Sequence, residues 1–322
     1  MKNNHRGLGN FIARFPKPVL LKLGKIFGVC LYFLDMPHRR LVWRNLQFCY
    51  PEWSANDIRK MSIRIFKQTG ITILEIIQSA YLSMEVILTG FRFVSGEEHL
   101  MDALKNMQKG LIFTACHIGN WEIGLQYLGG MTRRSSGRPL SAVARKIGYE
   151  WLDDWFDRYR KRLGNKVIYK KGAWPKMVQT LRNGEALLIT LDQSRYKQAV
   201  EVDFFNHKAT VTPAAAMAAM RCRCPVLPVF NVRETDGTQA IHVYPPIEMQ
   251  RTKDLRSDLQ VNTQKMIDAM EDMIRKYPDQ WVWFQRPWKK THPKLYPEWE
   301  ARRRQRKQSK KRRKLEATEN VQ

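Results

Sequence analysis

Short apolar runs of strand length alternate with helix-length segments along the middle of the chain. Such alternation builds a sheet whose faces are covered by helices. We therefore expect an α/β fold with a mixed central sheet flanked by helices. The predicted strands are 91–94, 111–116, 140–144, 166–169, 186–191, 226–232 and 240–246, and the predicted helices are 97–108, 150–163, 173–183, 214–222 and 254–276.

The segment ahead of this region is predicted to be helical. Residues 19–36 form an 18-residue apolar stretch that contains Lys22, Lys25 and Asp35. Each charge near the centre of a bilayer costs about 2.5–3.5 kcal/mol, so an interfacial amphipathic helix fits better than a membrane span. Packing of this helix on the protein's own core is an equally weighted alternative. After a short connection, a helix capped by Ser54 or Asn56 is expected to run to about residue 82.

The net charge of +26 indicates an anionic partner: nucleic acid, anionic lipid or an acidic carrier protein. When the ten positive and two negative charges of residues 301–322 are set aside, +18 remain on residues 1–300. The partner is therefore expected to meet the folded part of the chain as well. We expect a membrane-associating helix in 1–39, an enzyme domain over 40–300 and a basic, disordered tail over 301–322.

The five cysteines are an odd set without a Cys-x-x-Cys pair. This pattern argues against a disulfide framework and against a standard zinc site, and it favours a reducing compartment. The N-terminus has no compact apolar stretch followed by a small-residue cleavage site, so a secretory signal is not expected. We expect neither a metal nor a cofactor.

The stretch TACHIGNWEIG, residues 114–124, follows a predicted strand and places His117 where α/β proteins usually build their sites. Chance alone supplies about 0.65 His-x4-acid pairs in such a chain, so the spacing needs support. Inside one helix the two side chains would be about 140° apart. If Asn120 instead caps a helix that begins at Trp121, Glu122 could reach back to the imidazole and fix its tautomer. His117 could then act as a general base on a hydroxyl.

Two other chemistries at this place fit less well. Cys116 and His117 are neighbours on an extended strand and point to opposite faces, which is awkward for a nucleophilic dyad. Metal binding by His117 and Glu122 would need further ligands, and none stands at a motif spacing.

HIGNWE resembles the His-x4-Asp/Glu motif of the lysophospholipid acyltransferase superfamily. Five further segments resemble, in the same order, those of the late lipid A biosynthesis (lauroyl/myristoyl) acyltransferases. They are RNLQFCYPEWS (44–54), VARKIGYEWLDDWFDRYRKRLGNKVIYKKG (143–172), LRNGEALLITLDQS (181–194), VDFFNHKATVTPAAAMAAMRCRCPVLPVF (202–230) and YPDQWVWFQRPWKK (277–290). The resemblance covers residues 40–290 and implies a glycerol-3-phosphate acyltransferase-like fold. The chain departs from the pattern at Asn206, where many relatives have glycine, and in its less hydrophobic N-terminal segment.

The resemblance implies that His117 deprotonates an acceptor hydroxyl, which attacks an acyl thioester while Glu122 supports the imidazolium. The implied donor is acyl carrier protein or acyl-CoA, and the implied acceptor is an anionic glycolipid or phospholipid. These partners would be met at the cytoplasmic face of the bacterial inner membrane. The candidate substrate-binding residues are Arg145, Arg160, Glu185, Asp192 and Gln193.

Ordinary roles stay open for the same residues: surface salt bridges for the two arginines, and turns or caps for Glu185, Asp192 and Gln193. The aromatic WVWF segment is more simply explained by core packing than by an acyl pocket. Acylation of a lysophospholipid, an aminolipid or another glycolipid is the alternative reaction. A basic nucleic-acid-binding protein is a further alternative, although no such module is recognisable and nucleic acid is not the expected partner.

Overall fold

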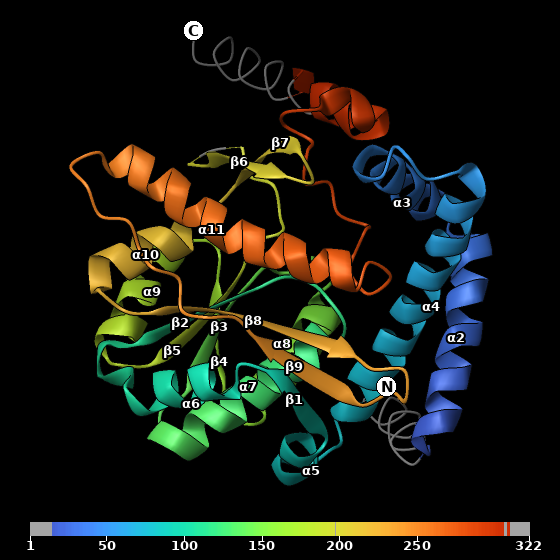
Figure 1. Ribbon diagram of the computed structural model, residues 1–322. Helices are drawn as coiled ribbons and strands as arrows, with labels where there is room; N and C mark the ends of the chain where they lie inside the picture. The colour runs from blue at the N-terminus through green and yellow to red at the C-terminus, as the bar shows by residue number, and fades with distance from the viewer. Residues whose placement is uncertain (1–14, 197, 306–307, 310–322) are drawn as a thin grey trace, which may run out of the picture.

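The computed structural model describes residues 15–196, 198–305 and 308–309. A seven-stranded sheet forms the centre, in the order β1-β9-β8-β2-β5-β3-β4 (Figure 1). The five strands from β8 to β4 are parallel, whereas β9 runs antiparallel to β8 and parallel to β1. The mixed sheet predicted from the sequence is thus confirmed. Its strands are β1 (Phe91–Ser95), β2 (Leu111–Ala115), β3 (Leu140–Ala144), β4 (Lys166–Tyr169), β5 (Ala186–Thr190), β8 (Val226–Arg233) and β9 (Gln239–Val243).

Helices cover both faces of this sheet because side chains of each strand alternate between two cores. Leu111 and Phe113 of β2 belong to one core, which also contains side chains from α6 and α7, whereas Ile112 belongs to the other. The helices that precede the C-terminal segment are α2 (Lys17–Leu34), α3 (Met36–Cys49), α4 (Ala55–Ser79), α5 (Met84–Thr89), α6 (Glu97–Lys105), α7 (Trp121–Ser136), α8 (Glu150–Lys161), α9 (Ala173–Arg182), α10 (Ala214–Cys222) and α11 (Leu255–Lys276).

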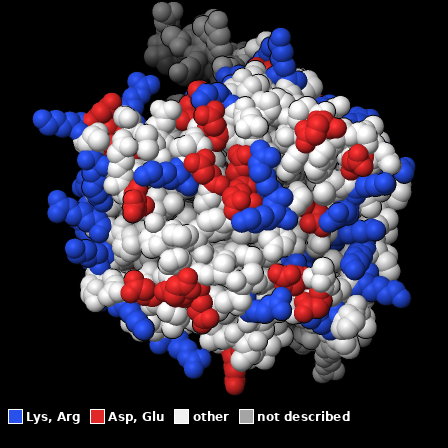
Figure 2. Space-filling view, in the orientation of Figure 1, with Lys and Arg blue, Asp and Glu red and all other residues white. Residues whose placement is uncertain are grey.

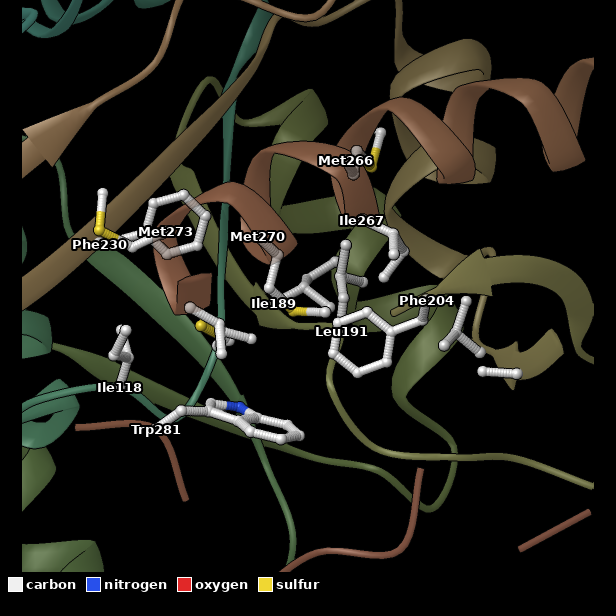
Figure 3. Packing of buried hydrophobic residues seen from close by; sticks show 14 of the residues in the cluster. Ile118, Ile189, Leu191, Phe204, Phe230, Met266, Ile267, Met270, Met273 and Trp281 are labelled. Carbon is white, nitrogen blue, oxygen red and sulfur yellow. The ribbon is translucent and has the colours of Figure 1, made fainter. Parts of the chain in front are cut away.

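The longest sheet-covering helix, α11, buries a row of methionines and isoleucines. Met266, Ile267, Met270 and Met273 of α11 belong to the same buried cluster as Trp281 (Figure 3). On the solvent side of the same helix, acidic and basic side chains are interspersed (Figure 2), some as pairs four residues apart. The excess positive charge is therefore not concentrated on this face.

The predicted N-terminal helix exists as α2, and one of its sides packs along α4. A methyl group on Gly28 would lie 2.1 Å from the Phe66 carbonyl oxygen, and one on Gly70 would lie 2.2 Å from that of Gly24. Glycine is therefore required for the two helices to approach this closely. The other side of α2 leaves apolar side chains exposed: Val19, Leu23, Ile26, Phe27, Phe33 and Leu34. No helix in the described ranges is long and apolar enough to cross a bilayer.

The sequence analysis missed a two-stranded hairpin, β6 (Val200–Phe204) and β7 (His207–Val211). The usual Asn-Gly or Asp-Gly turn signal is absent, because the turn is made by Phe205 and Asn206 at φ 53° and 60°. Asparagine tolerates this left-handed region, which accounts for a residue other than glycine at position 206. The helix expected to run to about residue 82 ends at Ser79, and Ser83 caps the separate helix α5.

The first described residues of the basic tail continue a helix. Residues 297–305 are helical, as are 308–309, whereas the sequence analysis expected a disordered tail over 301–322. Glu300 pairs with Arg303 and Arg304 one turn later, and the Arg303 guanidinium lies over the Trp299 and Tyr196 rings. These contacts extend the helix into the basic segment. Residues 310–322 lie outside the described residues.

Candidate active site

His117 follows the carboxyl end of β2, and Asp192 follows that of the adjacent strand β5. Ala115 pairs with Thr190 in the register of these parallel strands, so the two residues stand at equal offsets beyond the sheet. His117 Nδ1 lies 2.8 Å from Asp192 Oδ1, and the His117 backbone N–H donates to Asp192 Oδ2 at 2.9 Å. The sheet register itself therefore brings a histidine and a carboxylate together.

This contact fixes the protonation pattern of the imidazole. The Asp192 side chain is fully buried, but His117 and the Trp281 indole hold the pKa of its carboxyl below the ordinary value. A carboxylate can only accept hydrogen bonds, so His117 Nδ1 must donate, which leaves Nε2 with its lone pair. Burial disfavours the imidazolium, yet Asp192 and, at longer range, Glu122 raise the pKa of His117 above its ordinary value.

Asp192 is held from two further directions. Trp281 Nε1 donates to Oδ2 at 3.1 Å, and Gln285 Nε2 donates to the same oxygen at 2.8 Å. Trp281 is buried in the core, as Trp283 and Trp288 are, so the aromatic segment packs as expected and also orients the carboxylate. Neither Trp281 nor Gln285 was predicted to serve the site, because their distance in the chain conceals their proximity to Asp192.

Glu122 does not make the hydrogen bond to the imidazole that the sequence analysis expected. Its carboxylate instead accepts two hydrogen bonds from Arg160, with 2.9 Å between Nε and Oε2. The prediction was wrong on this contact because Arg160 of α8 reaches the first turn of α7 and occupies both carboxylate oxygens. Asn120 does cap α7, accepting from the Ile123 N–H at 3.2 Å. The expected break between His117 and the helix is thereby confirmed.

Backbone groups of the turn between β2 and α7 form hydrogen bonds with residues of other segments. The Val282 N–H donates to the His117 carbonyl at 2.9 Å, and the Gly119 N–H donates to the Gln280 carbonyl at 3.0 Å. Thr72 Oγ1 donates to the Gly119 carbonyl at 3.2 Å. At Gly119 φ is +56°, and a methyl group there would lie 2.3 Å from the Asn231 carbonyl oxygen. This residue must be glycine for His117 to stand where it does.

A cavity of about 440 Å³ opens beside His117. Its walls combine apolar side chains from α7 and the sheet with charged groups at the carboxyl edge. The Trp121 ring forms part of the wall. Its centre lies 5.3 Å from the centre of the His117 imidazole, and the two rings meet edge to face. The charged and polar side chains that line the cavity are those of His117, Glu122, Arg145, Lys146, Arg160, Lys170, Thr190, Gln193 and Asn231. The arrangement suits a substrate with a long apolar part and an anionic part.

The structure brings most of the predicted substrate-binding residues to this cavity, but it separates Glu185 from them. Arg145 and Gln193 line the wall, and Lys170 Nζ donates to Gln193 Oε1 at 2.9 Å. Glu185 precedes β5, at the opposite edge of the sheet from His117, and pairs with Lys166 at 2.9 Å. Its position therefore fits a surface ion pair, the ordinary role that the sequence analysis left open.

The described residues indicate neither a cysteine nucleophile nor a metal centre at this site. Cys116 is buried, and desolvation raises the pKa of its thiol well above the ordinary value, which disfavours a nucleophilic thiolate. All five cysteines are free thiols. Among the residues with described positions, no group of three or more His, Cys, Asp or Glu side chains is placed to hold a metal ion.

The fold and the site together define an α/β enzyme with a histidine–carboxylate pair at the carboxyl edge of its sheet. Residues 6–290 match the family described as bacterial lipid A biosynthesis acyltransferase. The chain belongs to this family and is an acyltransferase.

Curated relatives cover most of the chain at low identity. The lipid A biosynthesis lauroyltransferase of Escherichia coli K12 is 26% identical over 294 residues, covering 89% of this chain and 90% of the relative. The lipid A biosynthesis myristoyltransferase of the same strain is 24% identical, and the match covers 84% of this chain and 80% of the relative. The lipid A biosynthesis palmitoleoyltransferase of that strain is 23% identical, and the match covers 87% of this chain and 88% of the relative. The similarity thus covers most of this chain and most of each relative.

Proposed function

We propose that the protein transfers a fatty acyl chain from an acyl thioester to a hydroxyl of a lipid A precursor, with His117 as general base. The observation that carries this proposal is the hydrogen bond from His117 Nδ1 to Asp192, which directs the basic Nε2 away from the carboxylate. His117 lines the cavity, and its side chain keeps 20% of its surface exposed. A bound hydroxyl could therefore meet a base whose tautomer is already set.

In this mechanism, Nε2 takes the proton of the acceptor hydroxyl as its oxygen attacks the thioester carbonyl carbon. The tetrahedral intermediate collapses, the carbon–sulfur bond breaks, and the departing sulfur takes the proton back from the imidazolium. The products are an ester and a free thiol, so no proton is gained or lost. Asp192 stabilises the transient imidazolium, which is the role that a buried carboxylate plays in hydrolase triads.

Glu122 is assigned a different part from the one that its spacing suggested. Its negative charge favours the imidazolium without contact, and its two hydrogen bonds hold the Arg160 guanidinium against the cavity wall. Arg160 also lies over the Phe156 ring, 4.9 Å from its centre. An arginine fixed in this way can stabilise the oxyanion of the intermediate, and Arg145, which also lines the cavity, is the second candidate.

The charge and surface of the protein support anionic partners at a membrane. Acyl carrier protein and coenzyme A are both anionic, which suits a chain with a net charge of +26. The exposed apolar side of α2, with Leu23, Ile26 and Phe27, stands beside Lys22 and Lys25. Such a surface can lie on an anionic bilayer without spanning it. We place the enzyme at the cytoplasmic face of the bacterial inner membrane, where its thioester donors are found.

Mass spectrometry of lipids from cells that lack and then regain the gene tests the reaction. We expect a lipid A species to lose one acyl chain in the deletion strain and to recover it on complementation. A change confined to phospholipids or aminolipids would assign a different acceptor. A variant with His117→Ala, expressed at the wild-type level, serves as the control and should not restore the chain.

A further inference from the structure

Three large apolar side chains are exposed at the junction of β3 and α8: Ile147, Tyr149 and Trp151. Tyr149 and Trp151 keep 66% and 69% of their surfaces exposed, more than any other aromatic side chain of the described residues. Isolated exposed apolar residues are ordinary, whereas several in one short segment mark a surface that meets an apolar partner. We refer to residues 147–151 as the rim loop. The other exposed large apolar side chains that follow α4 in the described chain are more widely spaced: Tyr81, Val86, Val94 and Leu255.

The backbone of the rim loop is held by Asp153 of α8. The Asp153 carboxylate accepts from the Ile147 N–H at 2.6 Å and from the Gly148 N–H at 3.1 Å. The Asp153 N–H donates in turn to the Tyr149 carbonyl at 2.8 Å. At Gly148 φ is +106°, and a methyl group there would meet no other residue within 4 Å. The loop therefore has a defined shape and projects into open space.

The rim loop stands at the opening of the active-site cavity. Strands β2, β5 and β3 are parallel, so the loop that follows β3 lies at the same edge of the sheet as His117. Ile147 lines the cavity and is also half exposed, which places it on the rim. Phe156 of α8, one turn beyond Trp151, lines the cavity as well. A partner that covers Tyr149 and Trp151 thus also meets the cavity opening.

A bilayer surface suits these side chains better than a protein partner does. Tyrosine and tryptophan collect at membrane interfaces, because their rings are apolar while the hydroxyl and the indole N–H stay hydrated. The three side chains together expose about 400 Å² at most, about half of what each partner buries in a stable protein interface. The patch is therefore too small to hold a protein by itself, but a lipid surface needs only such anchors.

The charges beside the rim loop do not favour an acidic partner. Arg145 and Lys146 precede the loop, Glu150 lies within it, and Asp153 and Asp154 follow it. Attraction to this surface must therefore come from apolar burial, which salt does not screen. The Glu150 carboxylate also limits the depth of insertion, since it must remain in water.

We propose that the rim loop inserts shallowly into the bilayer interface and seats the cavity opening against the membrane. The lipid acceptor then enters the cavity directly from the bilayer. This inference rests on the proposed function, which supplies a membrane lipid as acceptor. It adds a second membrane contact to the exposed side of α2 and locates that contact at the active site.

Partitioning of the full chain onto phosphatidylcholine vesicles at high ionic strength tests the contact without any turnover. These vesicles carry no net charge, so binding to them measures apolar burial. We expect the double variant Tyr149→Ser/Trp151→Ser to partition about tenfold more weakly than wild type, because two aromatic rings no longer enter the interface. Leu255→Ser removes another exposed apolar side chain, at the start of α11, and should partition like wild type. Equal partitioning of the double variant and the wild type would overturn the proposal.

Quenching of tryptophan fluorescence by brominated phosphatidylcholine locates the inserted side chain. We expect bromine on the upper part of the acyl chains to quench the wild type more strongly than bromine near the chain ends. This difference should disappear in Trp151→Phe, which retains an aromatic ring for binding but removes the reporter. Quenching in Trp151→Phe that equals the wild-type value would place the membrane contact elsewhere and contradict the proposal.

Kinetics separate a bilayer contact from a contact with acyl carrier protein. If the rim loop meets the bilayer, the double variant raises KM for an acceptor embedded in vesicles and leaves KM for the carrier-protein thioester unchanged. A raised KM for the thioester with wild-type partitioning would assign the loop to the carrier protein and overturn the proposal. Absence of acyl transfer by the wild-type enzyme would instead refute the proposed function, while vesicle partitioning would still report on the rim loop.

Discussion

The guanidinium of Arg233, at the end of β8, binds the carboxylate of Glu75 on α4 through two hydrogen bonds of 2.7 and 2.5 Å. Both side chains are buried, with 3% and 8% of their surfaces exposed. Glu75 also accepts from Asn120 Nδ2 at 3.1 Å, so the pair reaches the residue that caps α7 directly after the His117 turn. The N-terminal helices are thereby tied to the candidate active site.

We expect Glu75→Ala to lower the free energy of unfolding by about 3–5 kcal/mol, because it leaves the Arg233 charge buried without its partner. Urea unfolding followed by circular dichroism measures this loss. The control is Glu298→Ala, which breaks the exposed pair with Arg44 and should cost at most about 1 kcal/mol. Similar losses of unfolding free energy in the two variants would show that the buried pair contributes no more to stability than the exposed pair.

Replacing the carboxylate behind the histidine should mainly affect turnover. Asp192→Asn retains the size of the side chain but removes the charge and allows the wrong imidazole tautomer. We expect kcat to fall about 10²–10⁴-fold with a smaller change in KM, as measured in steady-state acyl transfer. Glu185→Gln, at the opposite edge of the sheet, should keep wild-type kinetics. A kcat near the wild-type value in Asp192→Asn would contradict the assigned role.

The pH dependence of the reaction should reflect the raised pKa of His117. A general base must be neutral, so kcat/KM is expected to rise as the pH passes upward through this raised pKa. Asp192 is the main group that raises it, and in Asp192→Asn the rise should therefore move to lower pH. A pH profile of kcat/KM for both proteins measures the shift. An unchanged midpoint would mean that His117 is not the titrating base.

Much of the fold was predictable because local patterns determine it. The strand 111–116, the Asn120 cap and the helix from Trp121 follow from apolar runs and capping chemistry, and all are present. The hairpin turn at Phe205 and Asn206 carries no standard signal and was missed. Strand order could not be deduced either, because no local pattern states that β5 lies beside β2.

Because the sequence does not state that β5 lies beside β2, the sequence analysis assigned Glu122 as the hydrogen-bond partner of His117. From sequence, the nearest acidic residue after His117 was the natural partner. The structure brings in Asp192, 75 positions away, through the pairing of two strands that each end two residues before the side chain of interest. An equal offset after two predicted strands was a signal in the sequence. It becomes decisive only when the strands are known to be adjacent.

The close contact between α2 and α4 leads to a separate prediction about stability. Gly28→Ala places a methyl group against the Phe66 carbonyl, which belongs to the backbone and cannot move aside easily. We expect a loss of about 1–3 kcal/mol from overpacking, despite the better helix propensity of alanine. Leu23→Ala, on the exposed side of α2, should change the stability by less than about 0.5 kcal/mol. A stabilised Gly28→Ala variant would contradict the close helix contact.

Acyl transfer by purified wild-type and His117→Ala proteins tests the central claim most directly. Both would be supplied with acyl carrier protein thioester and a lipid A precursor, and the acylated product would be measured by mass spectrometry. We expect the wild type to form the ester and His117→Ala to lose at least about 10²-fold in rate, while circular dichroism shows an unchanged fold. Transfer by His117→Ala at the wild-type rate would contradict the assignment of His117 as the general base.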